Sequence, residues 1–95
     1  MKPSILVARA VFPEILEQLS HCFDVSDNQA DALWTPVDLA DRAKGKVGIL
    51  CTGSERIDAA LLTACPDLKI CANMAVGFNN FDLEAMTAAG VLGTN

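Results

Sequence analysis

The sequence predicts an α/β fold, a doubly wound parallel five-stranded sheet of flavodoxin-like order. Short apolar runs alternate with stretches of helical periodicity along the 95 residues. The apolar runs lack polar alternation, which is typical of parallel strands that are covered on both faces. A chain of this length forms one domain with a modest core, and its 52% of hydrophobic residues excludes a disordered tail.

Each predicted strand is a short run dominated by apolar residues, and the second, with Asp24 inside it, suits a sheet edge. The segment 26–33 is polar and separates the second strand from the second helix. The predicted strands are residues 4–8, 23–25, 47–51, 68–72 and 91–93.

Helix boundaries follow from capping residues and proline. Pro13 suits the first turn of the first helix, whose residues Ile15, Leu16, Leu19 and Cys22 share one face. The second helix begins after Thr35, with Pro36 at its first position and Asp38 at its third, and it ends at Gly45. The third helix is predicted over 57–65, before Pro66, and the fourth over 82–89, before Gly90.

Charge and composition exclude several classes of partner. The net charge is −5, without the clustered cations that a nucleic-acid surface needs. The longest apolar stretches, 5–8 and 59–62, fall far short of the ~20 residues that span a bilayer. No export signal follows Met1, so we expect a cytoplasmic protein with reduced thiols. The four cysteines show no metal-ligand spacing and are expected in the core.

Candidate binding residues lie in three loops at the carboxyl ends of the strands, 9–12, 52–55 and 73–80. In the third loop, Gly77 permits close backbone approach, and free N–H groups can hold a carboxylate or phosphate. The alternative is a glycine that serves only a tight turn. In the second loop, Thr52, Gly53 and Ser54 suit a small polar ligand. The alternative there is a capping box between Thr52 and Glu55 that needs no ligand.

Other signatures are absent from the sequence. There is no G-x-G-x-x-G or P-loop motif, and hence no dinucleotide signature. A receiver-type phosphoacceptor needs an acidic residue where Cys51 and Thr52 stand, and a flavodoxin needs a hydroxyl-rich loop at residues 9–13. We expect Trp34 to be a packing anchor, and no acid–base pair emerges.

Three segments carry a resemblance to one family. Residues 73–82, Asn-Met-Ala-Val-Gly-Phe-Asn-Asn-Phe-Asp, closely resemble a segment of the D-isomer-specific 2-hydroxyacid dehydrogenases, most of all the glyoxylate/hydroxypyruvate and 2-ketogluconate reductase branch. Residues 52–58 and 88–95 resemble further stretches of the same branch, so the likeness covers the whole chain. It implies that residues 1–95 are the N-terminal part of a discontinuous substrate-binding domain. The sheet would then be incomplete at its C-terminal end, and the NAD-binding Rossmann domain would be absent from this chain.

The resemblance also implies a function. The full enzyme would use NAD or NADP to reduce a small 2-oxo acid to the 2-hydroxy acid, and would be a homodimer. The backbone N–H groups of Val76 and Gly77 would hold the substrate carboxylate, with Gly53 and Ser54 bordering it. Asn79 stands where the family usually carries Asp, which removes a charge but keeps an acceptor. The catalytic Arg, Glu and His and the cofactor loop would lie outside the chain, so these 95 residues would hold no catalytic, cofactor or metal site and be inactive alone.

Two alternatives stay open. The first is a stand-alone α/β module that binds a small carboxylate without catalysis. The second is a self-associating module, because the predicted last strand has one uncovered apolar face.

Overall fold

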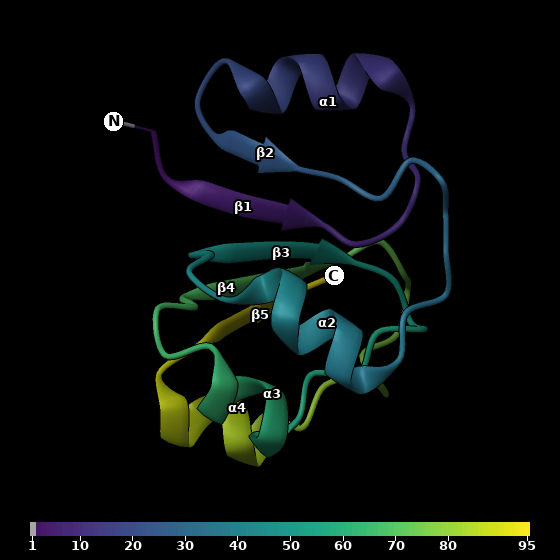
Figure 1. Cartoon of the computed structure of the whole chain (residues 1–95). Coiled ribbons are helices and arrows are strands. Elements are labelled where there is room, and N and C mark those ends of the chain that lie inside the picture. The colour runs from purple at the N-terminus through teal and green to yellow at the C-terminus, as the bar shows by residue number, and fades with distance from the viewer. Residues whose placement is uncertain (1) are drawn as a thin grey trace.

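The computed structural model describes residues 2–95 and contains a five-stranded parallel sheet in the order β2-β1-β3-β4-β5 (Figure 1). This confirms the predicted fold class and strand order. The strands are β1 (Ser4–Val7), β2 (Asp24–Ser26), β3 (Gly48–Cys51), β4 (Ile70–Asn73) and β5 (Leu92–Thr94). The helices are α1 (Pro13–Ser20), α2 (Pro36–Ala43), α3 (Ala59–Ala64) and α4 (Leu83–Ala89).

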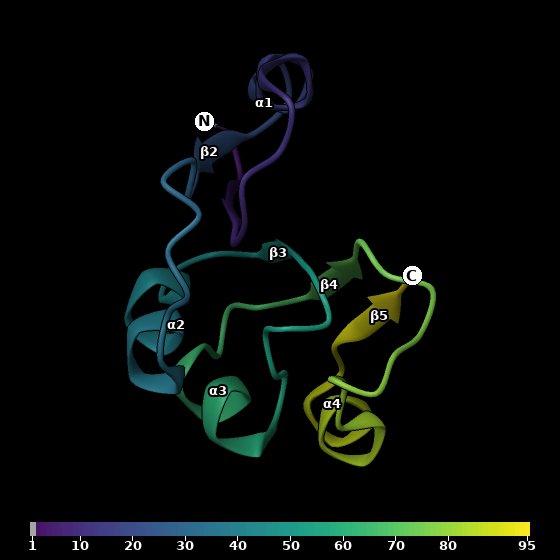
Figure 2. The ribbon, with the colours of Figure 1, turned by 90° about the vertical axis from the view of Figure 1, so that its right-hand side faces the viewer.

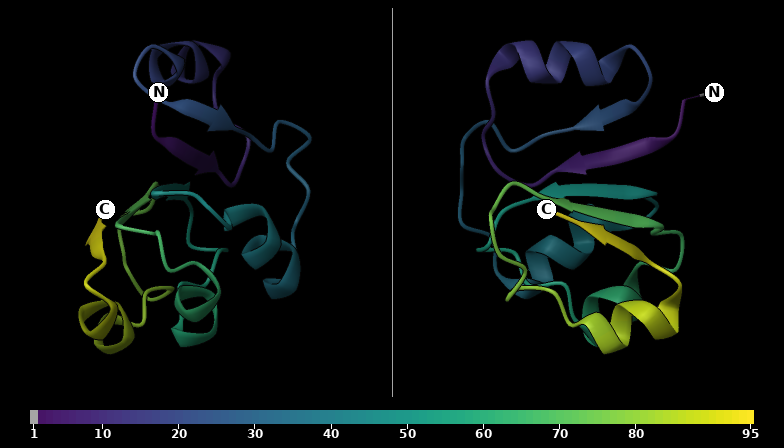
Figure 3. Two further views of the ribbon diagram at one scale, coloured as in Figure 1. Left: turned by 60° about the vertical axis from the view of Figure 1, so that its left-hand side comes forward. Right: turned by 180° about the vertical axis from the view of Figure 1, so that it is seen from behind.

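Helix α1 lies on one face of the sheet, and α2, α3 and α4 lie on the other (Figures 2 and 3). The chain steps from β1 outward to β2 and then returns past β1 to β3, β4 and β5. Because each crossover is right-handed, the change of direction moves the helices to the opposite face. The carboxyl ends of β1 and β3 therefore flank the point where the strand order reverses, which is where such sheets bind ligands.

The core fills the space between the sheet and helices α2 to α4. Its most deeply buried side chains include Leu6 of β1, Cys51 of β3 and Ile57. The face that carries α1 is more open within residues 2–95, where an apolar groove is lined by Ile5, Leu19, Phe23, Val47, Gly48, Ile49, Leu50, Ile70 and Ala72. Leu92 of β5 is 69% exposed. An uncovered apolar face at the last strand agrees with the expectation from the sequence.

Helix α1 corrects one sequence prediction. No residue of α1 is buried, Ile15 is exposed, and Leu16 and Leu19 are half-buried. Cys22 lies beyond the helix end and is exposed, so it is not a core thiol. The reason is that α1 packs mainly against the edge strand β2 and leaves much of its remaining surface open.

The other three thiols are buried as predicted. Burial raises the pKa of Cys51 to about 12, and it raises the pKa of Cys71 to about 12 as well. These groups are therefore neutral and inert at physiological pH. Within residues 2–95 no three His, Cys, Asp or Glu side chains gather in a geometry that suits a metal ion.

Capping contacts confirm most helix boundaries. The Thr35 hydroxyl accepts from the Asp38 N–H, and the Asp38 carboxylate accepts from the Thr35 N–H, which completes the predicted capping box. Gly90 ends α4 in the left-handed conformation, with φ of 73°. Trp34 packs against the core as predicted, with the Arg42 guanidinium 5.2 Å above its ring.

The third helix begins later than predicted. Asp58 caps it, because its carboxylate accepts from the Leu61 N–H at 3.0 Å. Ile57 is extended instead and pairs with Phe81 in an isolated parallel bridge. This bridge ties the segment after β3 to the segment before α4. No helix within residues 2–95 is long and apolar enough to cross a membrane.

Candidate functional site

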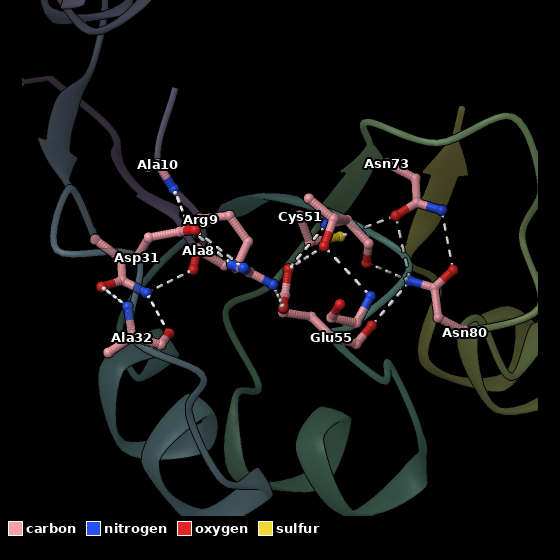
Figure 4. Close-up of polar contacts among 12 residues, drawn as sticks. Ala8, Arg9, Ala10, Asp31, Ala32, Cys51, Glu55, Asn73 and Asn80 are labelled. Carbon is pink, nitrogen blue, oxygen red and sulfur yellow. Dashed lines mark hydrogen bonds and ion pairs between the residues drawn. The ribbon is translucent and has the colours of Figure 1, made fainter. Parts of the chain in front are cut away.

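Three loops meet at the carboxyl edge of the sheet, because all five strands are parallel. They follow β1, β3 and β4, and they are the loops that the sequence singled out. Figure 4 shows that polar side chains join them, with Arg9 and Asp31 at one end and Asn73 and Asn80 at the other.

Arg9 fixes the first loop. Its Nε and Nη2 donate to the two carboxylate oxygens of Asp31 at 2.9 and 3.1 Å. Asp31 also accepts from the Ala10 N–H at 2.9 Å, and its φ of 54° is the one left-handed non-glycine backbone within residues 2–95. The Arg9 hydrogen bond, followed by that from Ala10, lowers the pKa of Asp31 to about 2. The Asp31 contact in turn raises the pKa of Arg9.

The Asp31 pKa predicts a pH dependence of stability. The folded-state pKa lies below its ordinary value of 3.8, so the ionised carboxylate stabilises the fold above about pH 4. That contribution is lost as the pH falls from about 4 through about 2. We expect urea midpoints of the native chain to drop over this window and those of Asp31→Asn to drop less. Asp67→Asn, at an exposed carboxylate, is the control and should follow the native curve. Equal acid sensitivity of Asp31→Asn and the native chain would contradict the assignment.

Glu55 closes the second loop as a turn. Its carboxylate is buried and accepts from the Thr52 N–H at 2.9 Å and from the Thr52 hydroxyl at 3.0 Å. Its second oxygen lies 3.8 Å from Nη1 of Arg9. The predicted reach of Glu55 back to Thr52 is therefore present, although no helix starts there. Gly53 and Ser54 form the exposed tip of the turn. The Thr52 hydroxyl is already bonded to Glu55, so Gly53 and Ser54 are the residues left to face a ligand.

Two buried asparagines hold the third loop. Nδ2 of Asn73 donates to the Gly77 carbonyl at 3.0 Å and to Oδ1 of Asn80 at 2.9 Å. Nδ2 of Asn80 donates to the carbonyls of Thr52 and Glu55 at 3.1 and 2.8 Å. The second and third loops are thus held side by side by one carboxamide.

The segment 74–79 presents backbone N–H groups to the outside. The Val76 side chain is 98% exposed, and no acceptor within residues 2–95 pairs with the N–H of Val76 or Gly77. The Val76 carbonyl accepts from Asn95 Nδ2, and the Gly77 carbonyl accepts from Asn73. In a trans peptide the N–H and C=O point in opposite directions, so these anchors direct the N–H groups of Gly77 and Phe78 away from the protein.

Gly77 is not required by the turn itself. Its φ is not left-handed, and a Cβ built at this position meets nothing within 4 Å. The alternative in which this glycine serves only a tight turn therefore has no support in the backbone. Open space above an unhindered backbone suits the close approach of a ligand.

The four candidate binding residues fall into two neighbouring loops. Val76 and Gly77 share one loop, and Gly53 and Ser54 share the other, with Asn80 joining the loops through Thr52. No hydrogen bond within residues 2–95 joins Ser54 directly to Val76 or Gly77. Sequence reasoning missed the anchoring roles of Arg9, Asp31, Asn73 and Asn80. The signal available for Asn73 was a polar residue directly after the apolar run 70–72.

Comparison with known proteins identifies the family. The family model "D-isomer specific 2-hydroxyacid dehydrogenase, catalytic domain" matches residues 5–95. The chain belongs to this family. It is 37% identical over 100 residues to a glyoxylate reductase of Aeropyrum pernix, with 99% of this chain and 28% of that protein covered. It is 32% identical over 95 residues to glyoxylate/hydroxypyruvate reductase B of Klebsiella pneumoniae, with 97% and 28% covered.

Solved structures agree with this membership in the 2-hydroxyacid dehydrogenases. A Polaromonas protein described as a D-isomer specific 2-hydroxyacid dehydrogenase, NAD-binding, superposes with a TM-score of 0.88 at 30% identity. The match covers 97% of this chain and 29% of that one. The chain therefore spans little more than a quarter of the length of the relatives that it matches.

Members of the family are NAD(P)-dependent oxidoreductases, but the described residues do not fit a dinucleotide. Such a site needs closely spaced glycines in the loop between a strand and a helix. The loop after β1 has none and carries Arg9, Val11 and Phe12, with the Arg9 guanidinium already paired to Asp31. Gly53 and Gly77 stand alone in their loops. The described residues therefore supply no part of a dinucleotide site.

Proposed function

We propose that residues 1–95 form the N-terminal part of the substrate-binding domain of an NAD(P)H-dependent 2-hydroxyacid dehydrogenase. The whole enzyme reduces a small 2-oxo acid of the glyoxylate, hydroxypyruvate or 2-ketogluconate type. The names of the relatives at 37% and 32% identity support the first two substrates. In this proposal the enzyme is a cytoplasmic homodimer, and NAD or NADP is bound outside residues 1–95.

The part played by this chain is recognition of the substrate carboxylate. The residues 75–78, here named the carboxylate loop, bind it through the N–H groups of Val76 and Gly77, and Gly53 and Ser54 border the substrate. The observation that carries this proposal is that the N–H groups of Val76 and Gly77 have no acceptor within residues 2–95, while the Val76 carbonyl accepts from Asn95 and so turns the Gly77 N–H outward. Adjacent N–H donors form charge-assisted bonds to a carboxylate without a cationic side chain.

The reaction itself needs groups that this chain does not place at the site. Hydride adds to the carbonyl carbon of the 2-oxo acid, and its oxygen takes a proton. His21 follows the end of α1 and precedes the start of β2. It therefore lies at the amino-terminal ends of the strands, opposite the loops of the candidate site. Arg9 is engaged by Asp31 and Glu55. The isolated chain is therefore proposed to be inactive, and oxidation of NADH by the purified chain with glyoxylate would contradict this.

Titration with oxamate, a 2-oxo acid analogue, tests the proposed function by NMR. Two charge-assisted hydrogen bonds of about 1.5–3 kcal/mol each give about 3–6 kcal/mol in total, so we expect weak binding, with a Kd of about 1 mM or above. The amide signals of Val76 and Gly77 should shift with oxamate. Oxamide, which has the same shape without the carboxylate, should leave them unchanged. Equal responses to oxamate and oxamide, or no response to either, would overturn the proposal that this loop binds a carboxylate.

A self-associating module is the second candidate, favoured by the apolar groove on the α1 face. Ile70 lines this groove and is 40% exposed. Leu92, its partner on the neighbouring strand β5, is 69% exposed. Sedimentation of the chain as a monomer at high concentration would discard this candidate. A stand-alone carboxylate sensor is distinguished by affinity, since it would bind its ligand at micromolar rather than millimolar concentration.

A further inference from the structure

Asn73 and Asn80 are buried to an extent that a simple connection between β4 and α4 does not require. Their side chains are 6% and 8% exposed, respectively. A buried carboxamide destabilises a fold unless its donors and acceptor are all bonded. Both carboxamides are fully bonded, and they are bonded to each other. The pair therefore forms a rigid unit behind the carboxylate loop.

Asn80 attaches this unit to the turn after β3. The side-chain Nδ2 of Asn80 donates to the main-chain carbonyls of Glu55 and Thr52 at 2.8 and 3.1 Å. The main-chain carbonyl of Asn80 accepts from the Ile57 N–H at 2.9 Å. The turn is itself fixed, because the Glu55 carboxylate is held by Thr52 and lies beside Arg9. Asn80 is thus bonded to a turn that is itself held by side-chain contacts.

Asn73 transmits this support to the loop. Oδ1 of Asn73 accepts from Asn80 Nδ2 at 3.2 Å, and Nδ2 of Asn73 donates to the Gly77 carbonyl at 3.0 Å. The orientation of the Asn73 side chain is set by Asn80. Without Asn80 the Asn73 side chain is free to turn away, and the peptide plane between Gly77 and Phe78 is free to rotate.

We propose that Asn80 is a positioning residue of the carboxylate loop. It holds Asn73 against the Gly77 carbonyl, and so anchors the carboxylate loop directly after its proposed donors, next to the turn that carries Gly53 and Ser54. This role rests on the proposed function, since the loop is positioned for a carboxylate ligand.

Asn80→Asp tests the proposal, with Asn79→Asp as the matched control. Both changes add the same charge one position apart, but Asn79 is exposed and makes no hydrogen bond within residues 2–95. Asn80→Asp replaces the donating group by an oxygen that faces the Thr52 and Glu55 carbonyls. We expect oxamate to bind at least about tenfold more weakly to N80D, the loss of one hydrogen bond to a charged group. N79D should weaken binding by no more than about threefold, because an exposed charge is screened.

Asn73→Ser keeps the test decisive if N80D does not fold. It removes the tether to Gly77 and leaves the bonds of Asn80 to Thr52 and Glu55 in place. The same loss of oxamate affinity is expected, with a smaller change in Tm. If N80D and N73S bind oxamate as N79D does, the positioning role is wrong and the proposed function stands.

A native chain that gives no oxamate response would instead overturn the proposed function. The positioning role is then decided without ligand, by the amide signals of Gly77 and Phe78 and their hydrogen exchange. N80D should shift these signals and speed their exchange relative to N79D. Unchanged signals and exchange in N80D would overturn the positioning role.

Discussion

Replacing Leu6 by alanine should lower the free energy of unfolding by about 2–5 kcal/mol. Leu6 lies on β1 between β2 and β3 and is 1% exposed, inside the core cluster that includes Leu39 and Ala43 of α2. Truncation removes the buried methyl groups and leaves a cavity that neighbours on a central strand cannot fill. A domain of this size has about 5–14 kcal/mol of stability in total, so the change is a large share of it.

Leu33→Ala is the matched control for Leu6→Ala. Leu33 is 74% exposed, and the same truncation there should change stability by less than about 0.5 kcal/mol. Urea denaturation followed by circular dichroism measures both. Similar midpoints for the two variants would show that the Leu6 side chain does not contribute to the core as its burial indicates.

The sequence sufficed for the fold because local signals and burial agree along most of this chain. Thr35, Pro36 and Asp38 form the helix start that their order predicts, and Gly90 ends α4 as predicted. The prediction failed where a tertiary contact competes with a local pattern. Ile57 continues the apolar period of α3, but its pairing with Phe81 keeps it extended. Cys22 fits the apolar face of α1, yet the helix ends before it.

For the candidate site, the sequence located the loops but not what holds them. Carboxyl ends of parallel strands gather by topology, so loops 9–12, 52–55 and 73–80 could be found from strand boundaries alone. The bonds of Asn80 to Thr52 and Glu55 span 28 and 25 residues, respectively. The Arg9–Asp31 pair spans 22. Such contacts depend on side-chain directions at loop tips, which no periodicity encodes.

Replacing Val76 by proline should weaken oxamate binding to the chain by about ten- to a hundredfold. Proline removes the N–H of residue 76, and a hydrogen bond to a charged group contributes about 1.5–3 kcal/mol. With a native Kd of about 1 mM, binding by the variant falls to about 10–100 mM, and the Gly77 signal should hardly move over the same titration.

Val76→Ala is the control for the proline variant, because it keeps the N–H and removes only a side chain that is 98% exposed. It should bind oxamate within about twofold of the native chain, since that side chain is almost wholly in solvent. Signals of core residues such as Leu6 and Ile57 should be unchanged in both variants, which separates a lost donor from a lost fold. If the proline and alanine variants bind oxamate equally, the N–H of Val76 is not a ligand donor. The carboxylate would then have to be held without that half of the loop, and Gly77 alone could not account for millimolar affinity.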